Sequence, residues 1–273
     1  PNPENEAAMQ SILDAVQESK ADLGIIFDTD VDRAGAVLSD GTELNRNRII
    51  AMMAAILLRE HPGTTIVTDS ITSTGLAAFI RKHGGVHHRF KRGYRNVINE
   101  SMRLNREGHD SQLAMETSGH GALKENYFLD DGAYLVTRLL IELARAKKEG
   151  YTLESLIADL AEPAESKEFR MNILVPDFKA YGQKIIDELN VYAASQPGWS
   201  VAPDNFEGVR VNLDKAHGDG WFLLRLSLHD PLIPLNIESD SVGGVRQIAA
   251  ELAPFLRPFD QLDTSALLAF AGC

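Results

Sequence analysis

The chain has 273 residues, of which 44% are hydrophobic and 24% are charged, and its formal net charge is −12. This length is sufficient for two domains, each with its own core. The acidic balance argues against general nucleic-acid binding, which needs a basic face, and no apolar run reaches the roughly 20 residues of a membrane span. The lone cysteine, Cys273, leaves no intrachain disulfide, which fits a reducing compartment and predicts a cytoplasmic protein.

The first half of the chain alternates between short apolar runs and helical patterns. Strands separated by helices of this length indicate a mostly parallel sheet with helices on both faces. Ligands of such sheets collect at the carboxyl ends of the strands, so the loops after the strands are the expected place for a site. The periodicity predicts strands at 23–27, 64–68, 86–90 and 111–116, and helices at 4–19, 48–60, 74–85, 94–108 and 132–150.

The composition changes at residues 151–168, where the polar stretch LAEPAESKEF predicts a linker. The order of elements beyond it indicates a smaller domain with an antiparallel sheet. The expected fold is therefore α/β, a mixed and mostly parallel three-layer domain followed by a smaller α+β C-terminal domain. Its second part has predicted strands at 169–175, 208–213, 221–226 and 233–238, and helices at 177–194 and 243–256.

Three carboxylates alternate directly after the first predicted strand, in the stretch GIIFDTDVDRAG. Asp28, Asp30 and Asp32 would repel one another unless a cation neutralised them. Hard oxygen ligands at this density suit Mg²⁺ or a similar divalent ion. Arg33 would hold one acid in place or meet a phosphate oxygen. The alternative, a solvated acidic turn, is disfavoured because the acids adjoin a buried run.

A second polar loop, METSGHGALKEN, follows the fourth predicted strand. Glu116 and Ser118 offer a carboxylate and a hydroxyl that would bind sugar hydroxyls. His120 adds a group that titrates near neutral pH, and Lys124 adds a point charge for phosphate. An ordinary polar loop between a strand and a helix remains the alternative.

Two further stretches, FKRGYRNV and LLRLSLHDPLIPLN, carry groups that suit an anion. Arginines, a hydroxyl and backbone amides together make a phosphate clasp. A solvated helix start and an edge-strand turn are the respective alternatives. The candidate residues in these stretches are Arg92, Arg95, Arg225, Ser227 and His229.

These stretches resemble the α-D-phosphohexomutases, a family that includes phosphomannomutases, phosphoglucomutases and phosphoglucosamine mutases. DTDVDR is similar to the family's metal-binding loop, usually Asp-Gly-Asp-x-Asp-Arg, and ETSGHG to its sugar-binding loop, usually Gly-Glu-x-Ser-Gly-His. KRGYRNV lies between them, where the family has a loop that helps to recognise the sugar. LDDGAY then opens the next helix as the family's Asp-Gly signature does.

The resemblance implies an isomerase of carbohydrate metabolism that interconverts hexose 1-phosphate and hexose 6-phosphate. In the family, a phosphoserine donates its phosphate to the sugar phosphate, and a bisphosphorylated intermediate turns around and returns one. The implied cofactor is Mg²⁺, bound by Asp28, Asp30 and Asp32. The implied catalytic residues are Arg33 and His120, and the implied substrate-binding residues are Arg92, Arg95, Glu116, Ser118, Lys124, Arg225, Ser227 and His229.

The resemblance also implies a domain order, since the family has four domains of which the first three are α/β. The sequence contains nothing like the family's Thr-Ala-Ser-His-Asn-Pro serine segment, so the chain is expected to begin inside the second domain and to be inactive alone. Its expected partners are a hexose phosphate and the missing N-terminal half of the same protein, without nucleic acid or membrane. The expected divisions are a domain 2 remnant with the metal loop (1–42), the sugar-binding domain 3 (43–150), the linker (151–168) and the phosphate-binding domain 4 (169–273).

The sequence departs from the family pattern at two further places. Thr29 stands where glycine is usual, which costs backbone freedom. RLSLHDP stands where the family's phosphate loop usually reads Arg-x-Ser-Gly-Thr-Glu-Pro. Arg225, Ser227 and Pro231 keep their places, but the geometry of this loop and the preferred sugar do not follow from the resemblance.

Two other functions stay open at this point. IIFDTDV also fits the haloacid-dehalogenase phosphatases, in which the first aspartate, here Asp28, would be the nucleophile. That function leaves Asp32 and ETSGHG without a role. The other possibility is a non-catalytic module that binds sugar phosphates, which the altered RLSLHDP loop keeps open.

Overall fold

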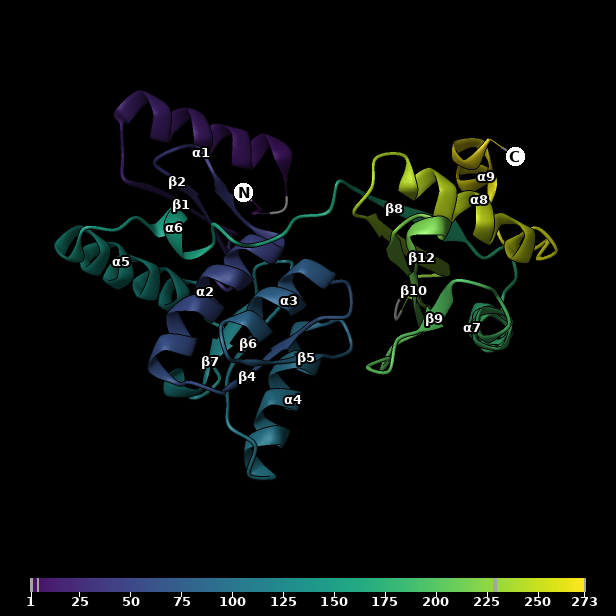
Figure 1. The fold of residues 1–273 in the computed structure, drawn as a ribbon, viewed down its shortest axis with the longest axis horizontal. Helices are drawn as coiled ribbons and strands as arrows, with labels where there is room; N and C mark the ends of the chain where they lie inside the picture. The colour runs from purple at the N-terminus through teal and green to yellow at the C-terminus, as the bar shows by residue number, and fades with distance from the viewer. Residues whose placement is uncertain (1, 4, 228–229, 273) are drawn as a thin grey trace. The chain divides into compact units, whose positions relative to one another are not determined.

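The computed structural model describes residues 2–3, 5–227 and 230–272, and the chain divides into two compact units, 1–161 and 162–273 (Figure 1). Each unit has its own hydrophobic core. Within the described residues, no helix is long and apolar enough to cross a membrane.

The first unit opens with a helix on a small antiparallel sheet. Helix α1 (Glu6–Ser19) packs Met9 and Val16 against Val37 of the sheet, whose strand order is β1-β2-β3. Because β1 pairs with β2 as a hairpin, it does not belong to the parallel sheet that the sequence predicted. The strands of this sheet are β1 (Leu23–Phe27), β2 (Ala34–Leu38) and β3 (Glu43–Leu44).

The second sheet of this unit has the order β5-β4-β6-β7. Strands β5, β4 and β6 run parallel, and β7 runs antiparallel to β6. This confirms a mixed, mostly parallel sheet. Its strands are β4 (Thr65–Thr68), β5 (Val86–Arg89), β6 (Ser111–Met115) and β7 (Gly121–Leu123), and the short helix η1 (Lys124–Asn126) follows β7.

Helices cover both faces of this sheet, because successive strand residues point to opposite faces. Ile66 and Leu113 belong to the core shared with α2, α3 and α5, whereas Val67 and Ala114 pack against α4. Helix α2 is buried at every position from Ile49 to Leu58, as its apolar sequence predicts. The four helices are α2 (Arg46–Glu60), α3 (Thr74–Lys82), α4 (Tyr94–Arg106) and α5 (Gly132–Glu149).

The predicted linker at 151–168 contains more structure than expected. Helix α6 (Leu153–Leu156) buries Leu153 in the core of the first unit, and β8 (Glu165–Asn172) already begins within the range. Strand β8 is an edge strand with mostly exposed side chains, so its polar composition reflects an edge and not a flexible connection.

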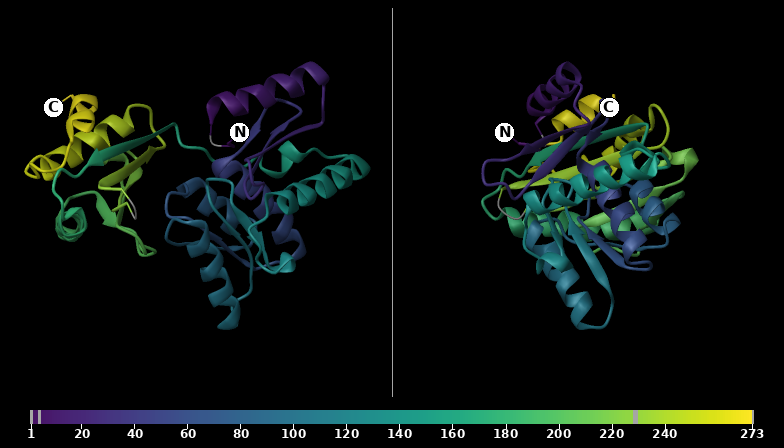
Figure 2. Two further views of the ribbon diagram at one scale, coloured as in Figure 1. Left: turned by 180° about the vertical axis from the view of Figure 1, so that it is seen from behind. Right: turned by 90° about the vertical axis from the view of Figure 1, so that its left-hand side faces the viewer.

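The second unit is α+β, as predicted. A five-stranded sheet of order β8-β12-β11-β10-β9, antiparallel throughout, packs with three helices around one core. Helices α8 and α9, yellow in Figure 1 and again seen from behind in Figure 2, lie over this sheet. The elements after β8 are α7 (Phe178–Ala194), β9 (Trp199–Val201), β10 (Val209–Leu213), η2 (Lys215–His217), β11 (Gly220–Leu224), β12 (Leu232–Ser239), α8 (Gly244–Leu256) and α9 (Ser265–Ala271).

Candidate functional site

The hairpin loop between β1 and β2 gathers the three predicted metal ligands. Carboxylate oxygens of Asp28, Asp30 and Asp32 all lie within 4.8 Å of one another. Asp28 is buried, Asp30 is exposed and Asp32 is half-buried. Oδ1 of Asp32 is buried without a hydrogen-bond partner among the described residues. Such an oxygen, close to two other carboxylates, fits a hard divalent cation.

Arg33 holds the first of these carboxylates from two directions. Its Nε donates to Oδ2 of Asp28 over 2.6 Å, and its backbone N–H donates to Oδ1 over 3.2 Å. Burial raises the pKa of Asp28, but the hydrogen bonds from Arg33 outweigh burial and hold this pKa below its ordinary value. Asp28 is therefore an ionised carboxylate with a fixed orientation.

The third carboxylate has the opposite tendency. Burial raises the pKa of Asp32, the charge of His120 opposes that rise, and the nearby charges of Asp28 and Asp130 add to it. The outcome is a pKa above the ordinary value. A cation at this loop would reverse the effect, because it favours the charged form of Asp32.

The strained residue of the loop is Val31, not Thr29. Val31 has φ 66°, a left-handed conformation that is unusual for a β-branched side chain, whereas Thr29 is not among the residues with positive φ. The carbonyl oxygen of Val31 accepts a hydrogen bond of 3.1 Å from the backbone N–H of Gly132, which begins α5. The backbone strain expected at Thr29 is thus absent. The strain lies at Val31, and α5 supports the turn there.

Glu116 joins the ETSGHG loop to the KRGYRNV loop. Its Oε1 accepts a 2.6 Å hydrogen bond from the backbone N–H of Gly93, and Oγ of Ser118 donates to its Oε2 over 3.2 Å. Only 4% of Glu116 is exposed. The carboxylate is therefore held in place before any ligand binds.

The aspartate loop and the ETSGHG loop lie against each other through their backbones. Arg33 and His120 form an antiparallel bridge, and the N–H of Ala34 donates to the carbonyl oxygen of Gly119 over 3.3 Å. Gly119 has φ 100°, and a Cβ there would lie 2.9 Å from the oxygen of Ala34. Only glycine allows this close approach of the two loops.

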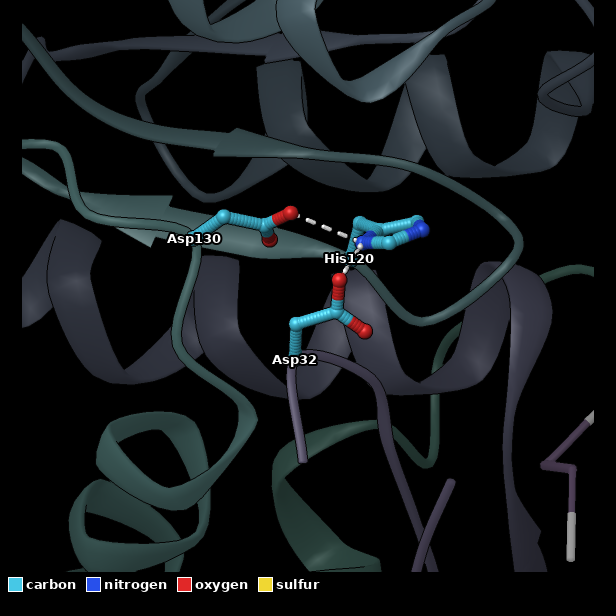
Figure 3. A group of neighbouring side chains, drawn as sticks. All are labelled: Asp32, His120 and Asp130. Atoms are coloured by element: carbon cyan, nitrogen blue, oxygen red, sulfur yellow. Dashed lines mark hydrogen bonds and ion pairs between the residues drawn. The ribbon is translucent and has the colours of Figure 1, made fainter. Parts of the chain in front are cut away.

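His120 lies between two carboxylates, as Figure 3 shows. Its Nδ1 is 2.8 Å from Oδ2 of Asp130 and 3.6 Å from Oδ2 of Asp32. The ring of Tyr94 stacks on the imidazole, with 4.8 Å between ring centroids. Burial lowers the pKa of His120, but the hydrogen bond to Asp130 and the charges of both acids outweigh burial and raise it.

The structure adds two acids that sequence reasoning did not select, Asp130 and Asp69. Asp69 is fully buried and accepts hydrogen bonds from the N–H of Thr117 (3.2 Å) and its Oγ1 (2.9 Å). Burial raises the pKa of Asp69 to about 6, with a contribution from Glu116 and opposition from Arg92. A signal was present, because Asp69 directly follows β4 as Glu116 directly follows β6.

The other predicted residues of the first unit divide into two groups. The charge of Arg92 reaches Asp69, and Nε of Arg95 donates to Oη of Tyr94 over 3.0 Å, so both lie at this end of the sheet. The structure does not bring Lys124 to the site. Its Nζ pairs over 2.9 Å with Asp110, which precedes β6, because β7 carries the chain back to the opposite end of the sheet.

The predicted phosphate loop belongs to the second unit. Arg225 is buried and lies 3.7 Å from Glu207, and Oγ of Ser227 accepts a 3.2 Å hydrogen bond from the N–H of Asp230. This hydrogen bond links Ser227, after β11, to Asp230, before β12. The predicted contact at His229 lies outside the described residues.

Two family models match the chain, "Phosphoglucomutase/phosphomannomutase, alpha/beta/alpha domain II" over residues 1–41 and "alpha/beta/alpha domain III" of the same family over residues 45–163. Together these matches span more than half of the chain. The chain belongs to the phosphoglucomutase/phosphomannomutase family. The resemblance seen in the sequence is confirmed.

Relatives of this family match across nearly the whole chain. The phosphomannomutase/phosphoglucomutase of Pseudomonas putida is 32% identical over 250 residues, which are 91% of this chain and 50% of that protein. The phosphoglucomutase of Neisseria meningitidis is 29% identical over 249 residues, again 91% of this chain and 50% of the relative. The chain therefore spans about half the length of the curated relatives that it matches.

Solved structures show the same fold. A phosphoglucomutase/phosphomannomutase family protein from Burkholderia thailandensis superposes with a TM-score of 0.77 and 28% identity, covering 96% of this chain and 53% of that one. The N-acetylphosphoglucosamine mutase of Aspergillus fumigatus, solved in complex with GlcNAc-6P and magnesium, has a TM-score of 0.57 and 14% identity, covering 90% of this chain and 52% of that one. The second likeness concerns the fold alone.

Proposed function

We propose that the chain forms the metal- and sugar-binding part of a phosphohexomutase, an isomerase that interconverts hexose 1-phosphate and hexose 6-phosphate. The observation that carries this proposal is the backbone contact between the aspartate loop and the loop that bears Glu116 and His120. Phosphoryl transfer to a sugar needs a divalent cation and hydroxyl-binding groups side by side. Membership of the family supports the same activity.

The aspartate loop fits Mg²⁺, because three carboxylates meet there and Asp32 has a buried oxygen without a hydrogen-bond partner among the described residues. Asp28, Asp30 and Asp32 would hold the ion. When bound, Mg²⁺ would polarise a phosphoryl oxygen. Arg33 keeps Asp28 ionised and oriented whether or not an ion is present.

The remaining residues would bind and orient the hexose phosphate. Glu116, already fixed by Gly93, would accept hydrogen bonds from sugar hydroxyls, and Ser118 would add a hydroxyl contact. His120 would contact the sugar or hold a proton at the reacting oxygen. The proposal gives phosphate contacts to Arg92, Arg95, Arg225, Ser227 and His229.

No serine of this chain is assigned as the nucleophile, because the sequence lacks a Thr-Ala-Ser-His-Asn-Pro-like segment. Within the proposal, that serine belongs to an N-terminal half of the same protein, and the reaction passes through a phosphoserine and a bisphosphorylated intermediate. The chain alone is therefore expected to show no turnover. A cytoplasmic location belongs to the same proposal, since a lone cysteine leaves no intrachain disulfide.

The phosphatase alternative receives no support. A nucleophilic Asp28 would leave Asp32 and the ETSGHG loop without a role, although the structure holds that loop against the aspartate loop. The chain also belongs to a different family. A non-catalytic module that binds sugar phosphates shares the same residues and differs only in turnover of the whole protein.

Calorimetric titration of glucose 1-phosphate into the chain, with Mg²⁺ present, tests the proposed sugar site. Glu116→Ala should weaken binding by about tenfold or more, because it removes a desolvated and preorganised charged acceptor. Glu116→Gln keeps the shape and should give an intermediate loss. Glu125→Ala is the matched control, since it removes an exposed carboxylate from η1 at the opposite end of β7.

Equal binding by the wild-type chain and Glu116→Ala would contradict the sugar site. Conversion of glucose 1-phosphate to its 6-phosphate by the chain alone would instead contradict the assignment of the nucleophile. The two outcomes separate the binding claim from the catalytic one.

A further inference from the structure

We propose that Asp130 is a positioning residue that fixes the tautomer of His120, so that Nε2 is the imidazole nitrogen presented to the substrate. The inference rests on the proposed function, in which His120 faces the sugar phosphate. Asp130 itself is not expected to touch the substrate, because its role is exerted through the ring of His120.

The distances decide which acid accepts the hydrogen bond from Nδ1 of His120. Oδ2 of Asp130 is 2.8 Å from Nδ1, which is a hydrogen bond, whereas Oδ2 of Asp32 is 3.6 Å away, beyond hydrogen-bond distance. A neutral imidazole has one donor nitrogen and one acceptor nitrogen, and an ionised carboxylate only accepts. In the neutral ring the proton therefore lies on Nδ1, and Nε2 keeps its lone pair.

The other nitrogen is available to a ligand. In Figure 3, Nε2 points away from both carboxylates, and it makes no hydrogen bond with any residue that the structure describes. The ring cannot readily turn over, because Tyr94 stacks on its face at an interplanar angle of 21°. The arrangement directs an unprotonated nitrogen outward.

Backbone contacts hold Asp130 in place. Its Oδ1 accepts a 3.2 Å hydrogen bond from the N–H of Gly121, and the residue forms an antiparallel bridge with Ala122. Since Gly121 occupies one oxygen, the other oxygen points to His120. Two neighbours thus fix the carboxylate, as a supporting residue of an imidazole requires.

A defined tautomer also keeps the two carboxylates in separate roles. Because Asp130 accepts the hydrogen bond from Nδ1, Asp32 is left free of that hydrogen bond and retains its oxygens for the proposed cation. Nε2 can then take a proton from a sugar hydroxyl. In that step the O–H bond breaks, its electron pair stays on oxygen, and an N–H bond forms on an imidazolium that Asp130 stabilises.

Nitrogen-15 NMR of the histidine-labelled chain, at a pH where His120 is neutral, measures the tautomer directly. The wild-type chain should show the Nδ1–H form. In Asp130→Asn, the N–H of Gly121 retains the amide oxygen on its own side, so the NH₂ group faces Nδ1 and forces it to accept. The dominant form of His120 should therefore switch to Nε2–H.

Asp131→Asn is the matched control, because it removes the same charge from the next residue. Asn also caps helices, so the hydrogen bond to the N–H of Tyr134 should survive and the Nδ1–H form should remain. Mg²⁺ affinity within about twofold of wild type in both variants would show that the aspartate loop is intact.

A wild-type chain with the Nε2–H form, or an unchanged tautomer in Asp130→Asn, would overturn the inference. The wild-type measurement needs no substitution, so it tests the inference even if a variant does not fold. Failure of the wild-type chain to bind Mg²⁺ would count against the proposed function and leave the tautomer result to be judged by itself.

Discussion

At the residue scale, the candidate site consists of acids whose protonation is set by different neighbours. The pKa of Asp28 lies below its ordinary value because Arg33 outweighs burial, whereas burial and nearby acids raise the pKa of Asp32. These two carboxylates lie on the same loop. A cation would therefore find one carboxylate already ionised and would itself stabilise the charge of the other.

Asp69 predicts a pH dependence of stability. Its folded pKa of about 6 exceeds the unfolded value, so the folded chain holds a proton that the unfolded chain releases between about pH 4 and 6. The contribution of Asp69 to the free energy of unfolding therefore falls as pH rises through this window. At roughly 1.4 kcal/mol per pKa unit, the loss at neutral pH is on the order of 3 kcal/mol.

Asp69→Asn should remove this dependence and make the chain more stable than wild type at pH 7, since an amide can keep both partners on Thr117. Urea unfolding at pH 4.5 and pH 7 measures the effect. Asp40→Asn, a change of an exposed aspartate in the turn after β2, should keep the wild-type profile. Identical profiles for Asp69→Asn and wild type would show that Asp69 is ionised across the whole window.

At the element scale, three segments distant in sequence build one site. The β1–β2 hairpin supplies the aspartate loop, the loop between β6 and β7 supplies Glu116 and His120, and the start of α5 supports both. The hydrogen bond from Gly132 to Val31 links the third segment to the first. The geometry of the proposed metal ligands therefore depends on a helix that carries none of them.

Gly132→Ala tests this dependence. A Cβ at residue 132 would lie 2.8 Å from the oxygen of Val31 and 3.0 Å from the carbonyl carbon of Arg33, so the aspartate loop must move. Overpacking of this kind costs about 1–3 kcal/mol, whereas helix propensity alone would favour alanine by about 1 kcal/mol. We expect thermal unfolding to show net destabilisation and calorimetry to show weaker Mg²⁺ binding.

Ala133→Gly, at the next and exposed position, measures the propensity change without a clash. It should destabilise the chain by about 1 kcal/mol and leave Mg²⁺ affinity unchanged. A stabilised Gly132→Ala chain with wild-type Mg²⁺ affinity would show that α5 does not constrain the loop.

At the scale of the whole molecule, the sequence was informative where a local pattern determines the structure. The α/β and α+β halves follow from the spacing of apolar runs. The aspartates and Glu116 follow from the loops that end β1 and β6. The short strands β2 and β7 were missed because AGAVL and GAL are too small and brief to carry a strand period.

The missed strand β7 determines where the residues after His120 lie. Without β7, the direction of the chain after His120 is undefined, and an anion contact is predicted for Lys124. The structure instead pairs Lys124 with Asp110 at the opposite end of the sheet. The partnership of His120 with Asp130 depends on the same antiparallel return. Contacts of this kind arise from tertiary folding, and no local propensity encodes them.

We propose above all that the aspartate loop holds a divalent cation directly beside the ETSGHG loop. Mn²⁺ shares the oxygen ligands of Mg²⁺, and its unpaired electrons broaden nearby NMR signals. Asp30→Asn is the sharpest variant, because Asp30 is exposed and makes no hydrogen bond with the described residues. Asp22→Asn, an exposed acid paired with Lys147, is the control.

The decisive measurement is the amide spectrum of the chain during a titration with Mn²⁺. We expect the signals of residues 28–33 and 117–121 to broaden first, and Asp30→Asn to weaken binding by about tenfold or more while Asp22→Asn does not. Broadening spread over the acidic surface, with equal affinity in the wild-type chain and Asp30→Asn, would contradict the proposal.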